Sequence, residues 1–149
     1  MTPPLAKEIK RVLLSWSSGK DSAWTLYHLQ QDPMVEVVGL LTTFNGEFNR
    51  SAIHGVRRQL LRLQSEAAGL PLIEIPLPWP CSNEQYESLM GTALDNARTQ
   101  LHMDAMAFGD LYLEDIRSYR ETKMQGTGLQ VMFPLWQIPT DQLARQMIA

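Results

Sequence analysis

Short apolar runs alternate with amphipathic stretches along almost the whole chain. The apolar runs predict strands at Val12–Ser17, Val35–Phe44, Leu72–Leu77, Ala105–Leu111 and Val131–Trp136. The amphipathic stretches predict helices at Ser22–Gln31, His54–Ala68, Asn83–Leu101, Glu114–Gln125 and Thr140–Ile148. Several strand candidates are apolar at consecutive positions, as expected when helices cover both faces of a parallel sheet. The alternation therefore predicts an α/β fold, a doubly wound, mostly parallel five-stranded sheet with helices on both faces.

Length and composition narrow the classes of protein that fit this pattern. A chain of 149 residues is the right size for one domain, residues 1–149. The formal net charge is −3, which disfavours nucleic acid as a partner. Cys81 is the single cysteine, so an internal disulfide is excluded. No apolar run approaches the roughly 20 residues that span a bilayer, and the N-terminal residues do not resemble a signal peptide. We expect a cytoplasmic protein without a membrane partner, and a homo-oligomer is compatible with the composition.

The segment Ser15–Ser22 is a short polar segment directly after the first apolar run and before a helix. Backbone N–H groups at a helix N-terminus lack intrahelical acceptors, and the helix dipole adds partial positive charge there. Gly19 allows close approach of an anion, Lys20 adds a positive charge, and Asp21 is a candidate metal ligand. The alternative is that Ser17, Ser18 and Asp21 only cap the helix.

The segment differs from two common phosphate-binding motifs. The P-loop needs a glycine five residues before Gly19, where this chain has Leu14, and the dinucleotide fingerprint needs three glycines. The segment resembles S-G-G-x-D-S, the signature of the PP-loop ATP pyrophosphatases. Ser17, Gly19, Asp21 and Ser22 match it, while Ser18 replaces the first glycine. That replacement is mild at an ordinary backbone angle and unfavourable if the position needs a positive φ.

Other polar residues follow later strands of the predicted sheet. In doubly wound sheets, ligands bind beyond the carboxyl ends of the strands, near the point where strand order reverses. Thr42 comes at the end of the second predicted strand, and Gly109 and Asp110 come at the end of the fourth. Downstream of them, Arg117 and Glu121 are spaced either as a solvated i,i+4 ion pair or as site residues.

His54 stands at the start of the second predicted helix, before Gly55. A histidine there could contact phosphate or act as an acid–base group near neutral pH. It could equally begin the helix without any chemical role. Both interpretations remain open.

Later motifs make the chain similar to the diphthine–ammonia ligase family and its bacterial relatives, within the PP-loop group. The likeness runs from about Val12 to the C-terminus and rests on the joint order of several short elements. These elements are Gly109-Asp110, Ile116-Arg117, Arg120-Glu121, Gly128-Leu129, Pro134-Leu135-Trp136 and Met147-Ile148. The resemblance implies a Rossmann-like fold of the adenine nucleotide α-hydrolase type.

The resemblance also implies cofactors and roles for the candidate residues. ATP would be held by Ser17, Ser18, Gly19, Lys20, Asp21 and Ser22, with Thr42, His54 and Gly109 also near the nucleotide. Asp21 would bind Mg²⁺, and the catalytic residues would be Lys20, Asp110, Arg117 and Glu121. Such enzymes transfer AMP from ATP to a carboxylate and release pyrophosphate, and ammonia then displaces AMP. The acceptor that carries the carboxylate is unknown.

One departure from the family keeps other functions open. Family members continue into a Gly-Glu-rich acceptor-side region that this sequence does not contain, so we expect a single PP-loop ATP-binding domain without that C-terminal region. A tRNA-modifying PP-loop enzyme is the first alternative, although its thiolating members commonly use cysteine pairs. A nucleotide-binding module without turnover is the second alternative.

Overall fold

A computed structural model describes residues 9–45, 50–51, 57–125 and 127–148. Along the chain the elements are β1 (Lys10–Ser15), α1 (Lys20–Gln31), β2 (Val35–Asn45), β3 (Arg50–Ser51), α2 (Arg58–Ala68), β4 (Leu72–Leu77), α3 (Asn83–Leu101), β5 (Ala105–Ala107), α4 (Glu114–Met124), β6 (Gln130–Met132) and α5 (Thr140–Ile148). Among these residues, no helix is both long and apolar enough to cross a bilayer.

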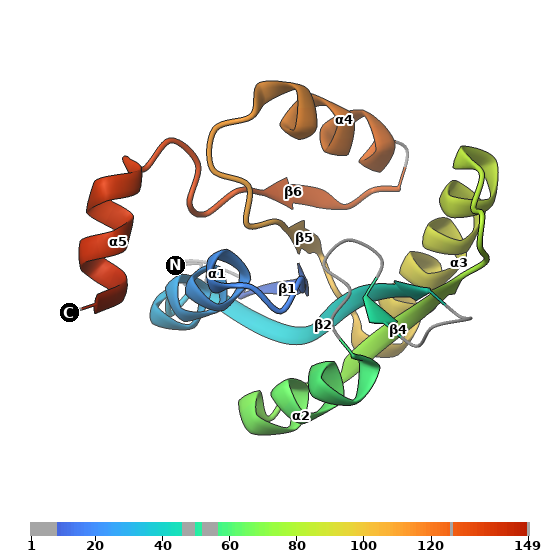
Figure 1. Cartoon of the computed structure of the whole chain (residues 1–149), viewed down its shortest axis with the longest axis horizontal. Helices are drawn as coiled ribbons and strands as arrows, with labels where there is room; N and C mark the ends of the chain where they lie inside the picture. The colour runs from blue at the N-terminus through green and yellow to red at the C-terminus, as the bar shows by residue number, and fades with distance from the viewer. Residues whose placement is uncertain (1–8, 46–49, 52–56, 126, 149) are drawn as a thin grey trace, which may run out of the picture.

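Five of the strands form a parallel sheet in the order β4-β2-β1-β5-β6. The two-residue strand β3 pairs antiparallel with the last two residues of β2. β4 uses the opposite edge of β2 at the same residues, so β3 lies on the β1 side, beyond the point where β1 ends. The chain moves outward from β1 to β2 and β4, then returns to β5 on the other side of β1. The reversal of strand order therefore falls between β1 and β5 (Figure 1).

Alternating side chains of the strands build two hydrophobic layers. Val12 and Leu14 of β1 face one layer, which contains Leu26 of α1 and Leu61 of α2. Leu13 faces the other layer, which includes residues of α3 and α4. The alternation follows from the two-residue period of a strand, and it places α1 and α2 on one face and α3 and α4 on the other. The predicted doubly wound α/β fold is confirmed.

Several predicted boundaries are wrong by a few residues, and local contacts explain why. The strand predicted at Ala105–Leu111 ends at Ala107, because the chain leaves the sheet after the Phe108 N–H donates to the Met132 carbonyl at 3.0 Å, and then packs against α1 at Gly109. The strand predicted at Val131–Trp136 ends at Met132, shortly before Pro134, which has no N–H for strand pairing. The short strand β3 was not predicted.

The first helix and the first strand also differ from the prediction at the loop that joins them. α1 begins at Lys20, and β1 ends at Ser15, so Ser17 belongs to the loop. α2 is described from Arg58, and the predicted residues 54–56 lie outside the described part of the chain. By contrast, α3 and β4 have the predicted bounds, and Ser82 and Gln85 form a capping box at the start of α3.

Glu74 of β4 joins the sheet to α2 through two arginines. Its carboxylate accepts hydrogen bonds from Arg58 at 2.9 and 2.5 Å and from Arg62 at 2.6 and 3.0 Å. The hydrogen bond from Arg62, with further contributions from Arg58, lowers the pKa of Glu74 to about 2, although partial burial opposes the shift. Only 14% of the Glu74 side chain is exposed.

We predict that Glu74 makes folding stability depend on pH in acid. Because the pKa is lower in the folded state, the contribution is complete above the ordinary value of 4.5 and disappears as pH falls from 4.5 toward about 2. Glu74→Gln should lower the unfolding free energy at pH 7 by on the order of 2 kcal/mol. Urea denaturation should show the two proteins converging as pH falls from 5 to 2. Glu36→Gln removes a more exposed ion pair with Arg11 and should change stability by less than about 1 kcal/mol.

Candidate nucleotide-binding site

The loop between β1 and α1 is held in a tight curve by its own hydroxyl groups. The Ser17 backbone N–H donates to Ser22 Oγ at 3.1 Å, and the two serine Oγ atoms lie 2.7 Å apart. The Gly19 N–H donates a long bond of 3.5 Å to Ser17 Oγ. Gly19 is the N-cap of α1, and within the described chain no side chain caps that helix. The first-turn N–H groups of α1 are therefore left for an external anion.

Ser18 adopts the left-handed backbone conformation, with φ of +71°. This is the position at which the S-G-G-x-D-S signature has its first glycine. An L-residue other than glycine incurs a cost of about 1–2 kcal/mol there, because its Cβ approaches the following carbonyl oxygen. The loop thus keeps the backbone shape that glycine favours while carrying a serine.

We predict that Ser18→Gly is tolerated and raises the unfolding free energy by about 1 kcal/mol. The gain is the relief of left-handed strain, less the extra backbone entropy that glycine has in the unfolded chain. Ser18→Ala keeps the strained Cβ and serves as the matched control, for which no gain is expected. Chemical denaturation of the three proteins measures both effects. Equal stability of the Gly and Ala variants would contradict a strained Ser18.

The loop after β5 packs directly against the first turn of α1. A Cβ atom placed on Gly109 would lie 3.1 Å from Thr25 Oγ1 and 3.3 Å from the Asp21 carbonyl oxygen. Thr25 is fully buried, and its hydroxyl donates to that same carbonyl at 2.6 Å. The close approach that Gly109 permits is therefore to α1. It brings Asp110 to the side of the β1–α1 loop.

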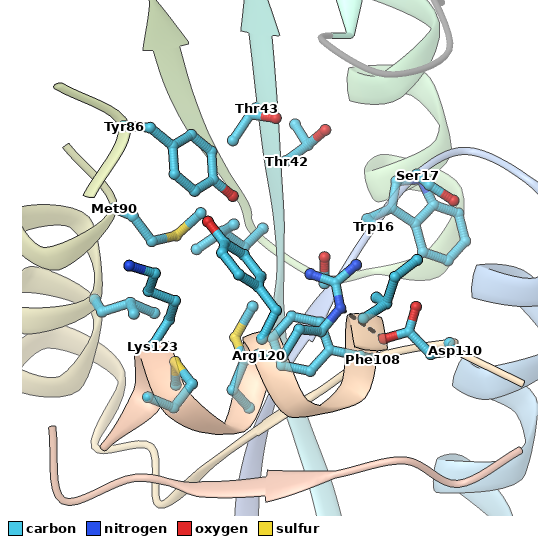
Figure 2. Close-up of a pocket in the computed structure, with 18 of the residues that line it drawn as sticks. Trp16, Ser17, Thr42, Thr43, Tyr86, Met90, Phe108, Asp110, Arg120 and Lys123 are labelled. Carbon is cyan, nitrogen blue, oxygen red and sulfur yellow. Dashed lines mark hydrogen bonds and ion pairs between the residues drawn. The ribbon is translucent and has the colours of Figure 1, made fainter. Parts of the chain in front are cut away.

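A cavity of about 480 Å³ opens at the carboxyl ends of β1, β2 and β5, between α3 and α4 (Figure 2). Of the predicted site residues, Ser17, Asp21, Ser22, Thr42, Gly109 and Asp110 line it. The structure brings these six together at the reversal of strand order, where ligands of doubly wound sheets bind. Thr42 is buried in the floor beside Thr43.

Asp110 and Arg120 form an ion pair in the wall of the cavity. Arg120 Nε donates to Asp110 Oδ2 at 2.6 Å, and the guanidinium carbon lies 4.3 Å from the centre of the Phe108 ring. The side chains of Arg120 and Asp110 are 27% and 18% exposed. Figure 2 shows the guanidinium in the middle of the view, joined to Asp110 by a dashed line. Neither of its terminal nitrogens makes a hydrogen bond to any residue that the structure describes.

The far end of the cavity is lined by α3 and by the last turns of α4. Tyr86, Met90 and Leu94 of α3 contribute an apolar wall at helical spacing. Burial raises the pKa of Tyr86, so its phenol stays protonated. Lys123 of α4 pairs with Glu87 of α3 across the cavity, and this hydrogen bond raises the pKa of Lys123.

The chain matches the family described as the diphthamide synthase N-terminal domain over residues 10–131. The chain belongs to this family. The match includes every residue that lines the cavity, from Ser15 to Thr127. None of the curated proteins matches the chain. As a diphthamide synthase N-terminal domain, the chain is an ATP-binding domain of the PP-loop ATP pyrophosphatase group.

Several predicted site residues lie outside the cavity of this diphthamide synthase domain. Lys20 extends from the loop, with its Nζ 2.9 Å from Asp21 Oδ1 and its side chain 74% exposed. Arg117 donates to Glu121 at 2.7 Å and lies over the rings of Phe133 and Trp136, and neither member of this pair lines the cavity. The catalytic roles of Arg117 and Glu121 stay predictions.

Three further predicted site residues are not among the described residues that line the cavity. Ser18 and Gly19 shape the loop from outside the cavity lining. His54 lies outside the described residues, so its two interpretations remain as they were.

From the sequence, Arg117 is predicted as a site residue and Arg120 is not. A usable signal was present: Ile116, Arg120 and Met124 follow one another at i,i+4 spacing, and all three line the cavity. Arg117 lies about 100° around the helix from Ile116 and about 60° from Arg120, and it contacts the rings of Phe133 and Trp136, which do not line the cavity. The apolar residues at both ends of the stripe indicate the face of α4 that is turned inward.

The residues of the domain fit a magnesium–nucleotide complex. Mg²⁺ is usually bound by one or two carboxylates together with phosphate oxygens and water. Asp21 lines the cavity in the first turn of α1, and its Oδ2 makes no hydrogen bond to any described residue. Asp21 is therefore the residue that would hold Mg²⁺, and the ion would supply positive charge for the phosphates.

Proposed function

We propose that this domain activates a carboxylate by adenylyl transfer from ATP, as the ATP-binding part of an amide ligase of the diphthine–ammonia ligase type. The observation that carries the proposal is the cavity itself. One opening joins the first turn of α1, which offers N–H groups to phosphate, to a chamber between α3 and α4 that is large enough to admit a second reactant.

The chemistry follows in two balanced steps. A carboxylate oxygen of the acceptor attacks the α-phosphorus of ATP, the bond from that phosphorus to the bridging oxygen breaks, and pyrophosphate leaves. Ammonia then attacks the acyl carbon, loses a proton, and AMP leaves with the electron pair of the broken carbon–oxygen bond. The net change is an amide, AMP and pyrophosphate from a carboxylate, ammonia and ATP.

Residues of the loop before α1, of β2 and of the cavity wall have separate roles in this chemistry. The first-turn N–H groups of α1 and Lys20 stabilise charge on the leaving pyrophosphate, since fixed donors at a helix N-terminus need no reorganisation. Asp21 would hold Mg²⁺, which would supply positive charge to the phosphates. The end of β2, including Thr42, lies beside the adenine end of the nucleotide. Asp110 orients Arg120 through the 2.6 Å hydrogen bond.

Product analysis tests the proposal against its alternatives. Incubation with Mg²⁺-ATP labelled in the α-phosphate, ammonium and candidate carboxylic acids should give labelled AMP, together with pyrophosphate. Binding of ATP without cleavage under all conditions would favour a nucleotide-binding module. Cleavage that depends on added tRNA would favour a tRNA-modifying enzyme.

A further inference from the structure

The basic side chains that line the cavity differ in how many of their hydrogen-bond donors are already used. Among the residues that the structure describes, two basic side chains line it, Arg120 and Lys123, both from α4. Lys123 is paired with Glu87. Arg120 uses only Nε for Asp110, and its two terminal nitrogens have no hydrogen-bond partner among the described residues. A guanidinium carries five donors, so the described residues use only a small part of the hydrogen-bonding capacity of Arg120.

The position of Arg120 is fixed on two sides. Phe108 stacks under the guanidinium at 4.3 Å, and Asp110 holds its Nε edge at 2.6 Å. Phe108 and Asp110 flank Gly109, which in turn packs on Asp21 and Thr25 of α1. The guanidinium is therefore held at a fixed place relative to the nucleotide loop, with little rotamer freedom left to lose on binding.

The chamber near Arg120 is largely apolar, although Tyr86, Tyr119 and the Lys123–Glu87 ion pair also line it. Apolar side chains of three elements line this chamber: Met106 from β5, Met90 and Leu94 from α3, and Ile116 and Met124 from α4. Figure 2 shows Tyr86 and Met90 on the side of the chamber away from Trp16 and Ser17, with Arg120 between the two groups. A ligand that fits would carry one anionic, planar end and an uncharged, largely apolar body.

We propose that Arg120 is the residue that binds the acceptor's carboxylate, and that the acceptor is a carboxylic acid with an apolar or aromatic body lying between α3 and α4. This inference rests on the proposed function. The two terminal nitrogens match the two oxygens of a carboxylate as a bidentate pair. Arg120 then presents a carboxylate oxygen toward the α1 end of the cavity, where the phosphates bind, while Tyr86, Met90 and Met124 contact the body.

The probe for this experiment is 3-phenylpropanoate, and its neutral amide is the matched control ligand. Binding is measured by calorimetry and NMR titration to the full chain in the presence of Mg²⁺ and a non-hydrolysable α,β-methylene analogue of ATP. We expect the acid to bind at least about tenfold more tightly than 3-phenylpropanamide, since a charge-assisted hydrogen bond contributes more than 1.4 kcal/mol.

Arg120→Gln should weaken binding of the acid by about tenfold, to the level of the amide. It should leave affinity for the Mg²⁺–nucleotide within about threefold. Arg120→Lys, which keeps the charge but loses the fork, should fall between the two. Arg145→Gln removes the same kind of side chain from the exposed face of α5 and should change neither affinity. Asp110→Asn combined with Arg120→Gln avoids leaving a half-buried carboxylate unpaired and should reproduce the loss if the single variant unfolds.

Three results would overturn the inference. The acid and the amide could bind alike to the wild type, or neither could bind at millimolar concentration. Arg120→Gln could also weaken the Mg²⁺–nucleotide as much as the acid, which would make Arg120 a nucleotide ligand. Failure of the proposed function looks different: the wild-type chain then binds no Mg²⁺–nucleotide, or binds it without ever forming AMP, whatever Arg120 does with the acid.

Discussion

Asp21→Ala should weaken binding of Mg²⁺-ATP by roughly 100-fold, or abolish it, while the fold stays intact. The carboxylate lies in the first turn of α1 and lines the cavity, so its loss removes the proposed protein ligand of Mg²⁺. The ion pair with Lys20 is largely exposed and contributes little to stability. Isothermal titration calorimetry measures the affinity, and thermal denaturation checks the fold.

Without the metal, we expect the effect of Asp21→Ala on ATP affinity to have the opposite sign. In EDTA, a carboxylate beside the triphosphate only repels it, so Asp21→Ala should bind free ATP at least as tightly as the wild type does. Asp141→Ala removes an exposed carboxylate from α5 and should alter neither measurement. An Asp21→Ala protein that binds Mg²⁺-ATP with wild-type affinity would exclude Asp21 as a metal ligand.

Gly109→Ala should lower the unfolding free energy by about 1–3 kcal/mol and weaken Mg²⁺-ATP binding at the same time. The new methyl group would lie 3.1 Å from Thr25 Oγ1 and 3.3 Å from the Asp21 carbonyl oxygen. Thr25 is fully buried and hydrogen-bonded, so it has no room to yield. The strain must instead separate the loop after β5 from the first turn of α1, which are the two segments that bring Asp110 next to the nucleotide loop.

Gly91→Ala provides a matched control, for which we expect a change of opposite sign in the free energy of unfolding. Gly91 lies inside α3, and a Cβ placed on it meets nothing within 4 Å. Alanine should therefore stabilise the helix by about 0.5–1 kcal/mol. Urea denaturation of the two variants separates a general effect of adding a methyl group from a clash at one place. Equal and small effects would show that Gly109 is not tightly packed.

The fold was predictable because its signals are local and repeated. Alternation of apolar runs and helical stretches is enough to predict a doubly wound sheet, and the capping residues Ser82 and Gln85 mark the start of α3. The end of β5 was not predictable in the same way. Gly109 and Asp110 indicate only roughly where the strand ends, and the packing of Gly109 against α1 shows where the chain turns away.

The site was predictable in part for a related reason. The loop residues and Asp110 follow from motif and topology, because the carboxyl ends of neighbouring parallel strands meet at one edge. The choice between Arg117 and Arg120 depends on which face of α4 is turned toward α3, and that is a property of tertiary packing. The left-handed angle of Ser18 depends likewise on the closure of the whole loop, which no single residue encodes.

The central position of β1 has a consequence for how the binding site comes into existence. Its neighbour β5 is distant in the chain, as the bond from the Arg11 N–H to Asp104 across 93 residues illustrates. Such non-local pairing raises the contact order and slows folding. The cavity is lined by residues of both β1 and β5, so a nucleotide bound there stabilises the folded domain relative to the unfolded chain. ATP at 100 times its dissociation constant would then add about 2.7 kcal/mol to the stability of the native state, because ATP would bind the native state and not the unfolded chain.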